Sequence, residues 1–174
     1  MNSRSFPIDD SYPMVTPLPV YQRGLEVLSE QWSQTESLKD EEPGSAKFLE
    51  YFFWRKNMVI WTCCTIESFV NLEGVSWMGE EFYKKAIERQ RIANKIRLIY
   101  TIKYQELLKP DDSTLKEVES LFELRNQFVH PKTRGHSENG SKPNQDVDFL
   151  SEWNSRRLDT LVKSVGSLIG IADE

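Results

Sequence analysis

Cysteine and histidine are scarce in this chain, which has 174 residues and only two of each. The two cysteines, Cys63 and Cys64, are neighbours in a strongly helical stretch, so a disulfide between them is geometrically disfavoured. A chain without a disulfide framework suits a reducing cytoplasm. Because the histidines and cysteines form no ligand cluster, the sequence predicts neither a metal site nor a cofactor.

Long apolar runs and phosphate-binding loops are missing as well. No segment approaches the roughly 18 uncharged apolar residues of a membrane span, and the first residues lack a charged stretch leading into an apolar one. None of the eight glycines has the spacing of a phosphate-binding loop. These absences argue against a membrane protein, an exported protein and a nucleotide hydrolase of the P-loop or Rossmann kind. They favour a soluble cytoplasmic protein.

The composition that remains is globular, with 39% hydrophobic and 28% charged residues, and a chain of this length can enclose one core. Four prolines and little apolar periodicity predict an extended arm over residues 1–20. Residues 21–174 are expected to form a single domain.

Apolar periodicity after residue 20 indicates helices and no strands. The expected long helices run from Tyr21 to the acidic stretch before Pro43, from an N-cap at Ser45 to near Gly74, over residues 92–108, from a cap at Asp112 or Ser113 to Pro131, and over residues 147–171, with a short helix over residues 79–89. The second of these is the longest and most apolar, and it is expected to lie at the centre. The sequence therefore predicts an all-α fold, an antiparallel bundle of four to five helices.

The net charge of −5 argues against broad attraction to nucleic acid, and no DNA-specific binding is expected. The charge is unevenly distributed, however. Residues 84–109 carry eight basic side chains against two acidic ones, whereas residues 26–50 are mostly acidic. A solvated helix face is the ordinary explanation of such runs.

One charge lies in the middle of an apolar helix face. At about 100° per residue, the apolar side chains of the fourth long helix form an arc whose centre is within roughly 10° of Arg125. A buried guanidinium without a partner costs several kcal/mol, so Arg125 must meet an anion or face a cleft. Glu67 on the second helix is the best candidate partner, and Asn71, one turn further, offers an amide to orient Arg125 or a ligand. A buried Arg125–Glu67 bridge that only fixes helix packing is the structural alternative.

His130 lies about 140° further round the same helix than Arg125, while Asn126 lies within about 40° of His130. Because His130 precedes Pro131, it is expected to leave helical geometry at the helix end, where partial exposure suits proton transfer near neutral pH. The alternative is a histidine that merely interacts with the helix dipole and caps carbonyl groups.

Residues 124–131, LRNQFVHP, resemble the signature of the HEPN superfamily, in which an Arg and a His lie a few residues apart and a polar residue often follows the Arg. Residues 66–71, IESFVN, resemble a Glu-Asn pattern of bacterial members, and the expected helix order agrees over residues 21–171. The resemblance implies a helical bundle that dimerises, so that two Arg–His pairs meet in one cleft.

The resemblance also implies metal-independent endoribonuclease activity of a toxin or defence type. His130 would transfer protons, and Arg125 would bind the scissile phosphate. Asn126 would support these two residues, and Glu67 and Asn71 would be further supporting residues. Attack by the RNA 2′-hydroxyl needs only proton transfer and stabilisation of an anionic phosphorane, so no metal is required.

RNA, a second copy of the chain and an antitoxin protein are the partners that the resemblance implies. The basic segment 84–109 and the loop residues Lys132, Arg134 and Lys142 are expected to hold the RNA backbone, and His136 is a weaker candidate. Other members of the superfamily have lost catalysis and serve as binding modules, and the motif does not separate the two groups. A non-catalytic nucleotide- or protein-binding module is therefore the alternative function.

Overall fold

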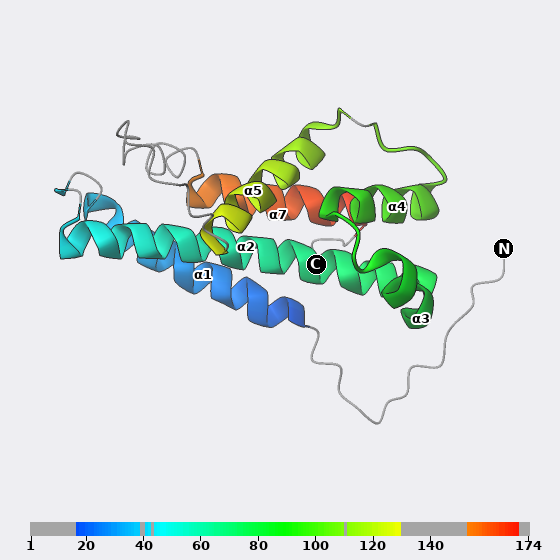
Figure 1. The fold of residues 1–174 in the computed structure, drawn as a ribbon, viewed down its shortest axis with the longest axis horizontal. Coiled ribbons are helices and arrows are strands. Elements are labelled where there is room, and N and C mark those ends of the chain that lie inside the picture. The colour runs from blue at the N-terminus through cyan, green and yellow to red at the C-terminus, as the bar shows by residue number, and fades with distance from the viewer. Residues whose placement is uncertain (1–16, 39–40, 43, 110, 130–152, 171–174) are drawn as a thin grey trace, which may run out of the picture.

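The computed structural model describes residues 17–38, 41–42, 44–109, 111–129 and 153–170, and these contain helices and no strand (Figure 1). The all-α prediction is confirmed for this part of the chain. The long helices are α1 (Pro17–Thr35), α2 (Ala46–Met78), α4 (Ile92–Tyr104), α5 (Ser113–Val129) and α7 (Ser155–Ile169). Shorter turns complete the order: η1 (Glu36–Leu38) follows α1, and α3 (Glu80–Phe82) and η2 (Tyr83–Ile87, a π-helical turn) follow α2.

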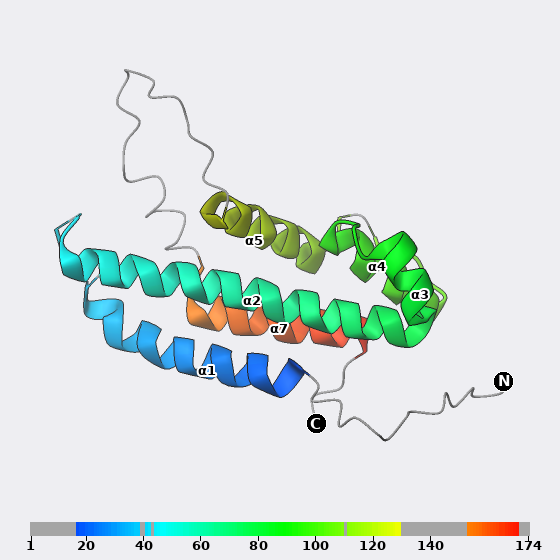
Figure 2. The same cartoon turned by 60° about the horizontal axis from the view of Figure 1, so that its bottom comes forward.

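Helix α2 is the centre of the molecule, as predicted. It contacts α1, α4, α5 and α7, and Figures 1 and 2 show α1 along one side of it with α4 and α5 on another. A helix that is apolar all round needs neighbours on every face. The buried side chains of α2 meet that description, and they include Tyr51, Met58, Val59, Cys63, Ile66, Phe69 and Val70.

Helices α4, α5 and α7 each turn one apolar face toward α2, and together they close a single core. Residues spaced three or four apart supply it, which is the spacing of one helix face. They are Ile92, Ile96 and Ile99 from α4, Leu115, Val118, Leu121 and Leu124 from α5, and Leu158, Leu161, Val165 and Ile169 from α7. None of the described helices combines the length and apolarity needed to cross a membrane.

A buried arginine attaches α1 to α2. Arg55 is 4% exposed, and its guanidinium carbon lies 4.0 Å from the ring of Trp32 and 4.4 Å from the ring of Tyr51. Its Nη2 donates to Glu36 Oε2 at 2.7 Å, and Trp32 Nε1 donates to the same oxygen at 3.1 Å. Two aromatic rings and a carboxylate thus compensate for the burial of this charge.

The ends of α1 and α2 differ from the prediction. Residues 17–20 of the predicted arm are helical, because Pro17 stands in the first turn, where the missing N–H would have no helical partner in any case. Helix α2 continues past Gly74 to Met78 and ends at Gly79, whose positive φ of 81° is a backbone conformation that glycine accepts. The rest of the predicted arm lies outside the described residues.

The ends of α4 and α7 also differ from the prediction. Helix α4 ends at Tyr104, one turn early, because Gln105 adopts the left-handed conformation with φ 57°. The last helix is predicted over residues 147–171, of which 147–152 lie outside the described residues; Asn154 has extended backbone and caps α7, which begins at Ser155. The Asn154 side chain accepts from Arg157 N at 2.9 Å, which satisfies a free N–H of the first helical turn.

Candidate functional site

The last turns of α5 cross over α2 in the view of Figure 1, and two contacts locate where the helices meet. Lys56 Nζ is 5.0 Å from the ring centroid of Phe128, and the Cys63 thiol donates to the carbonyl of Leu121 at 3.8 Å. The last turns of α5, which carry Arg125, therefore face the middle of α2, between Lys56 and Cys63.

Arg125 is half-buried, and its Nη1 donates to Asn126 Oδ1 at 3.0 Å. Its Nε is buried without a hydrogen-bond partner. Among the described residues Arg125 forms no ion pair, so the bridge to Glu67 that would serve packing alone is not formed. The arrangement leaves a cation with unused hydrogen-bond donors at the edge of the core.

Arg125 and Glu67 both shift the pKa values of the two cysteines of α2. Burial raises the pKa of the Cys64 thiol, Arg125 lowers it and Glu67 raises it. Burial also raises the pKa of Cys63, and the same two charges act on it in the same directions. Both thiols therefore stay protonated near neutral pH, which argues against a nucleophilic role for them.

Asn71 is held by two buried donors. Tyr83 Oη donates to Asn71 Oδ1 at 2.7 Å, and Lys95 Nζ donates to the same oxygen at 3.1 Å. Lys95 and Tyr83 are each 2% exposed. The amide oxygen of Asn71 thus binds groups on α4 and η2 rather than Arg125.

Neither Lys95 nor Tyr83 is among the residues that the sequence predicts for the site. Lys95 counts there only as one of the basic side chains of residues 84–109. The position of Lys95 in the sequence does indicate that it is buried. It comes three residues after Ile92 and four before Ile99, on the apolar face of its helix. A lysine in such a position is buried and needs a partner.

Glu67 lies between these two groups of residues. Burial lowers the pKa of Lys95, while Glu67 and then Glu88 raise it. Burial raises the pKa of Tyr83 to about 12, and the same two carboxylates add to that shift. Glu67 therefore affects the pKa values of the cysteines near Arg125 as well as those of Lys95 and Tyr83.

We call Cys64, Glu67 and Asn71 the polar stripe. All three are half-buried and follow one another at intervals of three and four residues, so they share one face of α2. Arg125 approaches the stripe from α5, and Lys95 approaches it from α4. The stripe supplies a carboxylate and an amide, and Arg125 and Lys95 add two cations beside it.

The remaining predicted site residues follow α5. The structure describes helix α5 as far as Val129. His130 and the loop residues Lys132, Arg134, His136 and Lys142 lie outside the described residues. Of the predicted Arg–His pair, Arg125 is therefore the member that the structure describes.

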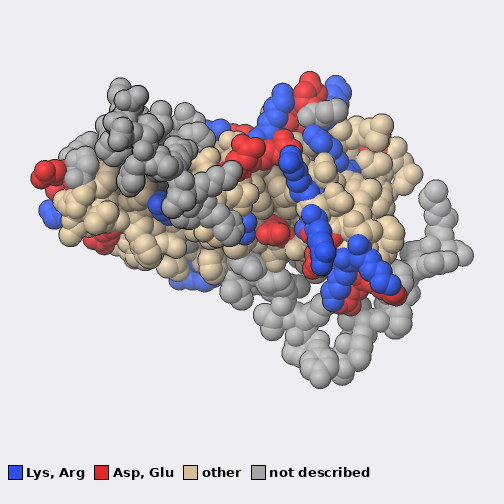
Figure 3. Space-filling model, in the orientation of Figure 1, with Lys and Arg blue, Asp and Glu red and all other residues tan. Residues whose placement is uncertain are grey.

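The basic segment does not form one continuous unpaired face within the described residues. Lys84 and Lys85 pair with glutamates one turn earlier, at 2.5 and 2.7 Å, and Lys103 pairs with Glu73 at 2.9 Å. Lys95 is buried. Figure 3 shows Lys and Arg side chains crossing this face in a line, with Asp and Glu beside them at its ends. A solvated, partly neutralised surface explains much of the segment.

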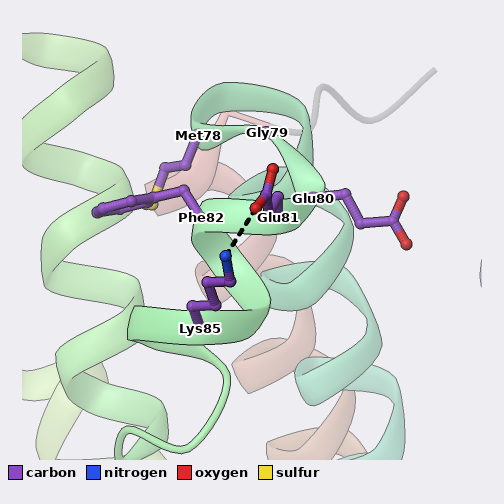
Figure 4. A pocket seen from close by; sticks show the side chains of 6 residues that line it. All are labelled: Met78, Gly79, Glu80, Glu81, Phe82 and Lys85. Atoms are coloured by element: carbon purple, nitrogen blue, oxygen red, sulfur yellow. Dashed lines mark hydrogen bonds and ion pairs between the residues drawn. The ribbon is translucent and has the colours of Figure 1, made fainter.

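A pocket of about 470 Å³ lies at the C-terminal end of α2, where the chain turns into α3 (Figure 4). Lys85 Nζ donates to Glu81 Oε1 across it at 2.7 Å, so its central charges neutralise each other. It contains no nucleophile and no histidine. The lining residues are Met78, Gly79, Glu80, Glu81, Phe82 and Lys85.

Within the described part of the chain, no three His, Cys, Asp or Glu side chains are grouped closely enough to hold a metal ion. Comparisons with protein-family models, curated proteins and solved structures found no match to this chain. Inferences about function therefore depend on the residues of the site and on the motif that they form.

Proposed function

We propose that this protein is a metal-independent endoribonuclease of a toxin or defence type, with a composite Arg/His site at the interface of a homodimer. The observation that carries the proposal is Arg125. It is a half-buried guanidinium without a carboxylate partner among the described residues, hydrogen-bonded to Asn126 at the end of α5. His130 follows that helix directly, in the register of the HEPN motif.

The chemistry requires only these side chains. Arg125 binds the non-bridging oxygens of the scissile phosphate, and Asn126 orients the guanidinium by holding Nη1. One His130 takes the proton of the 2′-hydroxyl as the O2′–P bond forms, and a second histidine protonates the O5′ that leaves. The products are a 2′,3′-cyclic phosphate and a 5′-hydroxyl. Each proton transfer contributes about 10²–10⁴ in rate.

A second copy of the chain would supply the complementary group. On an ideal helix Arg125 and His130 would lie about 140° apart, and a second copy would place its own motif across a shared cleft from the first. Large apolar side chains are exposed in the first turns of α2 and at the last residue of α5: Leu49 and Phe53 are each 56% exposed, and Val129 is 44% exposed. An exposed apolar surface of this kind favours a protein partner. An antitoxin would be a further candidate for the same surface, and cytoplasmic RNA would be the substrate.

The test is cleavage of single-stranded RNA by the full-length protein in EDTA. We expect wild type to cleave, and His130→Ala to lose at least about 10²-fold in rate while its melting temperature stays unchanged. His136→Ala is the matched control, because it removes the other histidine of the chain. Undiminished cleavage by His130→Ala would remove the site assignment. RNA binding without any cleavage by wild type would favour the non-catalytic module.

A further inference from the structure

The side-chain amide of Asn71 has a defined orientation. Its Oδ1 accepts hydrogen bonds from Lys95 Nζ at 3.1 Å and from Tyr83 Oη at 2.7 Å. An ammonium group has donors and no acceptor, so a flipped amide would set N–H groups against Lys95. The oxygen therefore faces α4 and η2, and the NH₂ group faces away from them.

The amide nitrogen of Asn71 and the carboxylate of Glu67 have no partner within the described part of the chain. No described residue accepts a hydrogen bond from Asn71 Nδ2, and none forms an ion pair with Glu67. The buried side-chain atoms without a partner are all arginine Nε atoms, so neither group is among them. Both side chains are half-buried. The polar stripe thus presents two donors and a pair of acceptors to a ligand.

The spacing of Glu67 and Asn71 places these groups side by side. Residues four apart on a helix have Cβ atoms about 5–6 Å apart. Arg125 approaches the same face from α5 and supplies a cation suited to a phosphate. Sequence-selective proteins hydrogen-bond the edges of unstacked RNA bases while separate contacts hold the backbone. The acceptors of Glu67 and the donor of Asn71 suit the edge of a base, and Arg125 suits the phosphate of the backbone.

We propose that Glu67 and Asn71 form a nucleobase site beside Arg125 that selects guanine, and that Lys95 and Tyr83 are positioning residues for it. The proposal rests on the proposed ribonuclease function. Guanine offers N1–H and N2–H as two neighbouring donors to the carboxylate, and its O6 accepts from the amide NH₂. Adenine and cytosine place a ring acceptor beside a single amine, and uracil places one N–H between two carbonyls. Each of these bases would set a lone pair against the carboxylate.

The decisive variant is Asn71→Asp. It keeps an oxygen for Lys95 and Tyr83 but replaces the NH₂ donors with an acceptor. Equilibrium binding would be measured in EDTA with short single-stranded RNAs that differ in one base, in a His130→Ala background that prevents cleavage. We expect the parent to bind the guanine oligonucleotide at least about 10-fold more tightly than the adenine one, since a bidentate base contact contributes about that much or more. Asn71→Asp and Glu67→Gln should each abolish the difference.

Asn57→Asp is the matched control, because it makes the same change elsewhere on α2, where the Asn57 amide donates to a backbone carbonyl. It should leave the guanine preference intact. Lys95→Met frees one side of the Asn71 oxygen and should reduce the preference without abolishing it. The preference is a ratio of two affinities, so a general loss of stability would not mimic this pattern.

The outcomes separate this proposal from the ribonuclease proposal. Cleavage or binding without a base preference, or a preference that survives in both Asn71→Asp and Glu67→Gln, overturns the guanine site and leaves the ribonuclease standing. Guanine-selective binding without cleavage by wild type supports the site and overturns the enzyme. A protein that neither binds nor cleaves RNA overturns both.

Discussion

The buried Nε of Arg125 has no hydrogen-bond partner, an arrangement that costs stability in a folded protein. Replacing the side chain with methionine removes this unsatisfied atom and keeps most of the volume. We predict that Arg125→Met unfolds in urea with a free energy equal to that of wild type or up to about 1 kcal/mol higher. The same variant should lose RNA cleavage, because the phosphate loses its cation.

Arg55→Met is the comparison for this experiment. The guanidinium of Arg55 is paired with Glu36 at 2.7 Å and covered by two rings, so its loss should lower the free energy of unfolding by roughly 2–3 kcal/mol. A loss of similar size in Arg125→Met would show that Arg125 holds the fold. Cleavage that survives in Arg125→Met would remove its phosphate role.

Lys95 and Tyr83 give the stability a pH dependence in the alkaline range, with opposite signs. The folded state lowers the pKa of Lys95, so below its ordinary value of 10.5 the unfolded chain binds more protons. The free energy of unfolding therefore rises with pH through that window. The folded state raises the pKa of Tyr83 from 10.0 to about 12, so this stabilisation is complete below pH 10 and is lost toward pH 12. Glu67 and Glu88 are the charges that act on both groups.

We predict that Lys95→Met removes the rise below pH 10.5, and that Tyr83→Phe removes the fall above pH 10, which is on the order of 2 kcal/mol. Urea unfolding between pH 8 and pH 11.5 measures both effects. Lys95→Met should still lose stability above pH 10, and Tyr83→Phe should still gain stability with pH below 10.5. Each variant therefore serves as the control for the other. A Tyr83→Phe profile that still falls as steeply above pH 10 would mean that the phenol is not buried in solution.

At the scale of the elements, the turn after α2 depends on a glycine. A Cβ built on Gly74 would lie 2.1 Å from Cε2 of Tyr83, so the ring occupies the space that any other residue would need. We predict that Gly74→Ala lowers the free energy of unfolding by about 1–3 kcal/mol, although alanine is the better helix former. Ser76→Ala, at an exposed position of the same helix, should be neutral or slightly stabilising. A Gly74→Ala protein more stable than wild type would contradict this packing of η2.

The helix starts could be predicted where the capping group is local. The Ser45 side chain accepts from Phe48 N at 3.1 Å, and Asp112 Oδ1 accepts from Leu115 N at 3.1 Å, both at predicted caps. A cap involves side chains within one turn, so the sequence displays it. The glycine at position 74 reads as a helix end, but in the structure it makes room for a ring from another element. That contact cannot be inferred from local sequence.

At the scale of the whole molecule, the proposed dimer requires the exposed apolar side chains of α2 and α5. We predict that Phe53→Asp converts a dimer into a monomer, measured by light scattering after size-exclusion chromatography, and abolishes cleavage, because charge on a buried apolar interface is costly. Leu107→Asp is the matched control: Leu107 is 86% exposed and lies in the connection that follows α4. It should leave both mass and activity unchanged. A monomeric wild type with full activity would contradict the composite site.

The sequence by itself determined the helical class, the central position of α2 and the presence of Arg125 on an apolar face, because these follow from the period of each helix. Only the tertiary structure decided that Asn71 binds Lys95, 24 residues away, and that Arg125 forms no bridge to Glu67. Periodicity states the face on which a side chain lies. It does not state the register in which two helices meet, and that register selects the partners of every charge in the site.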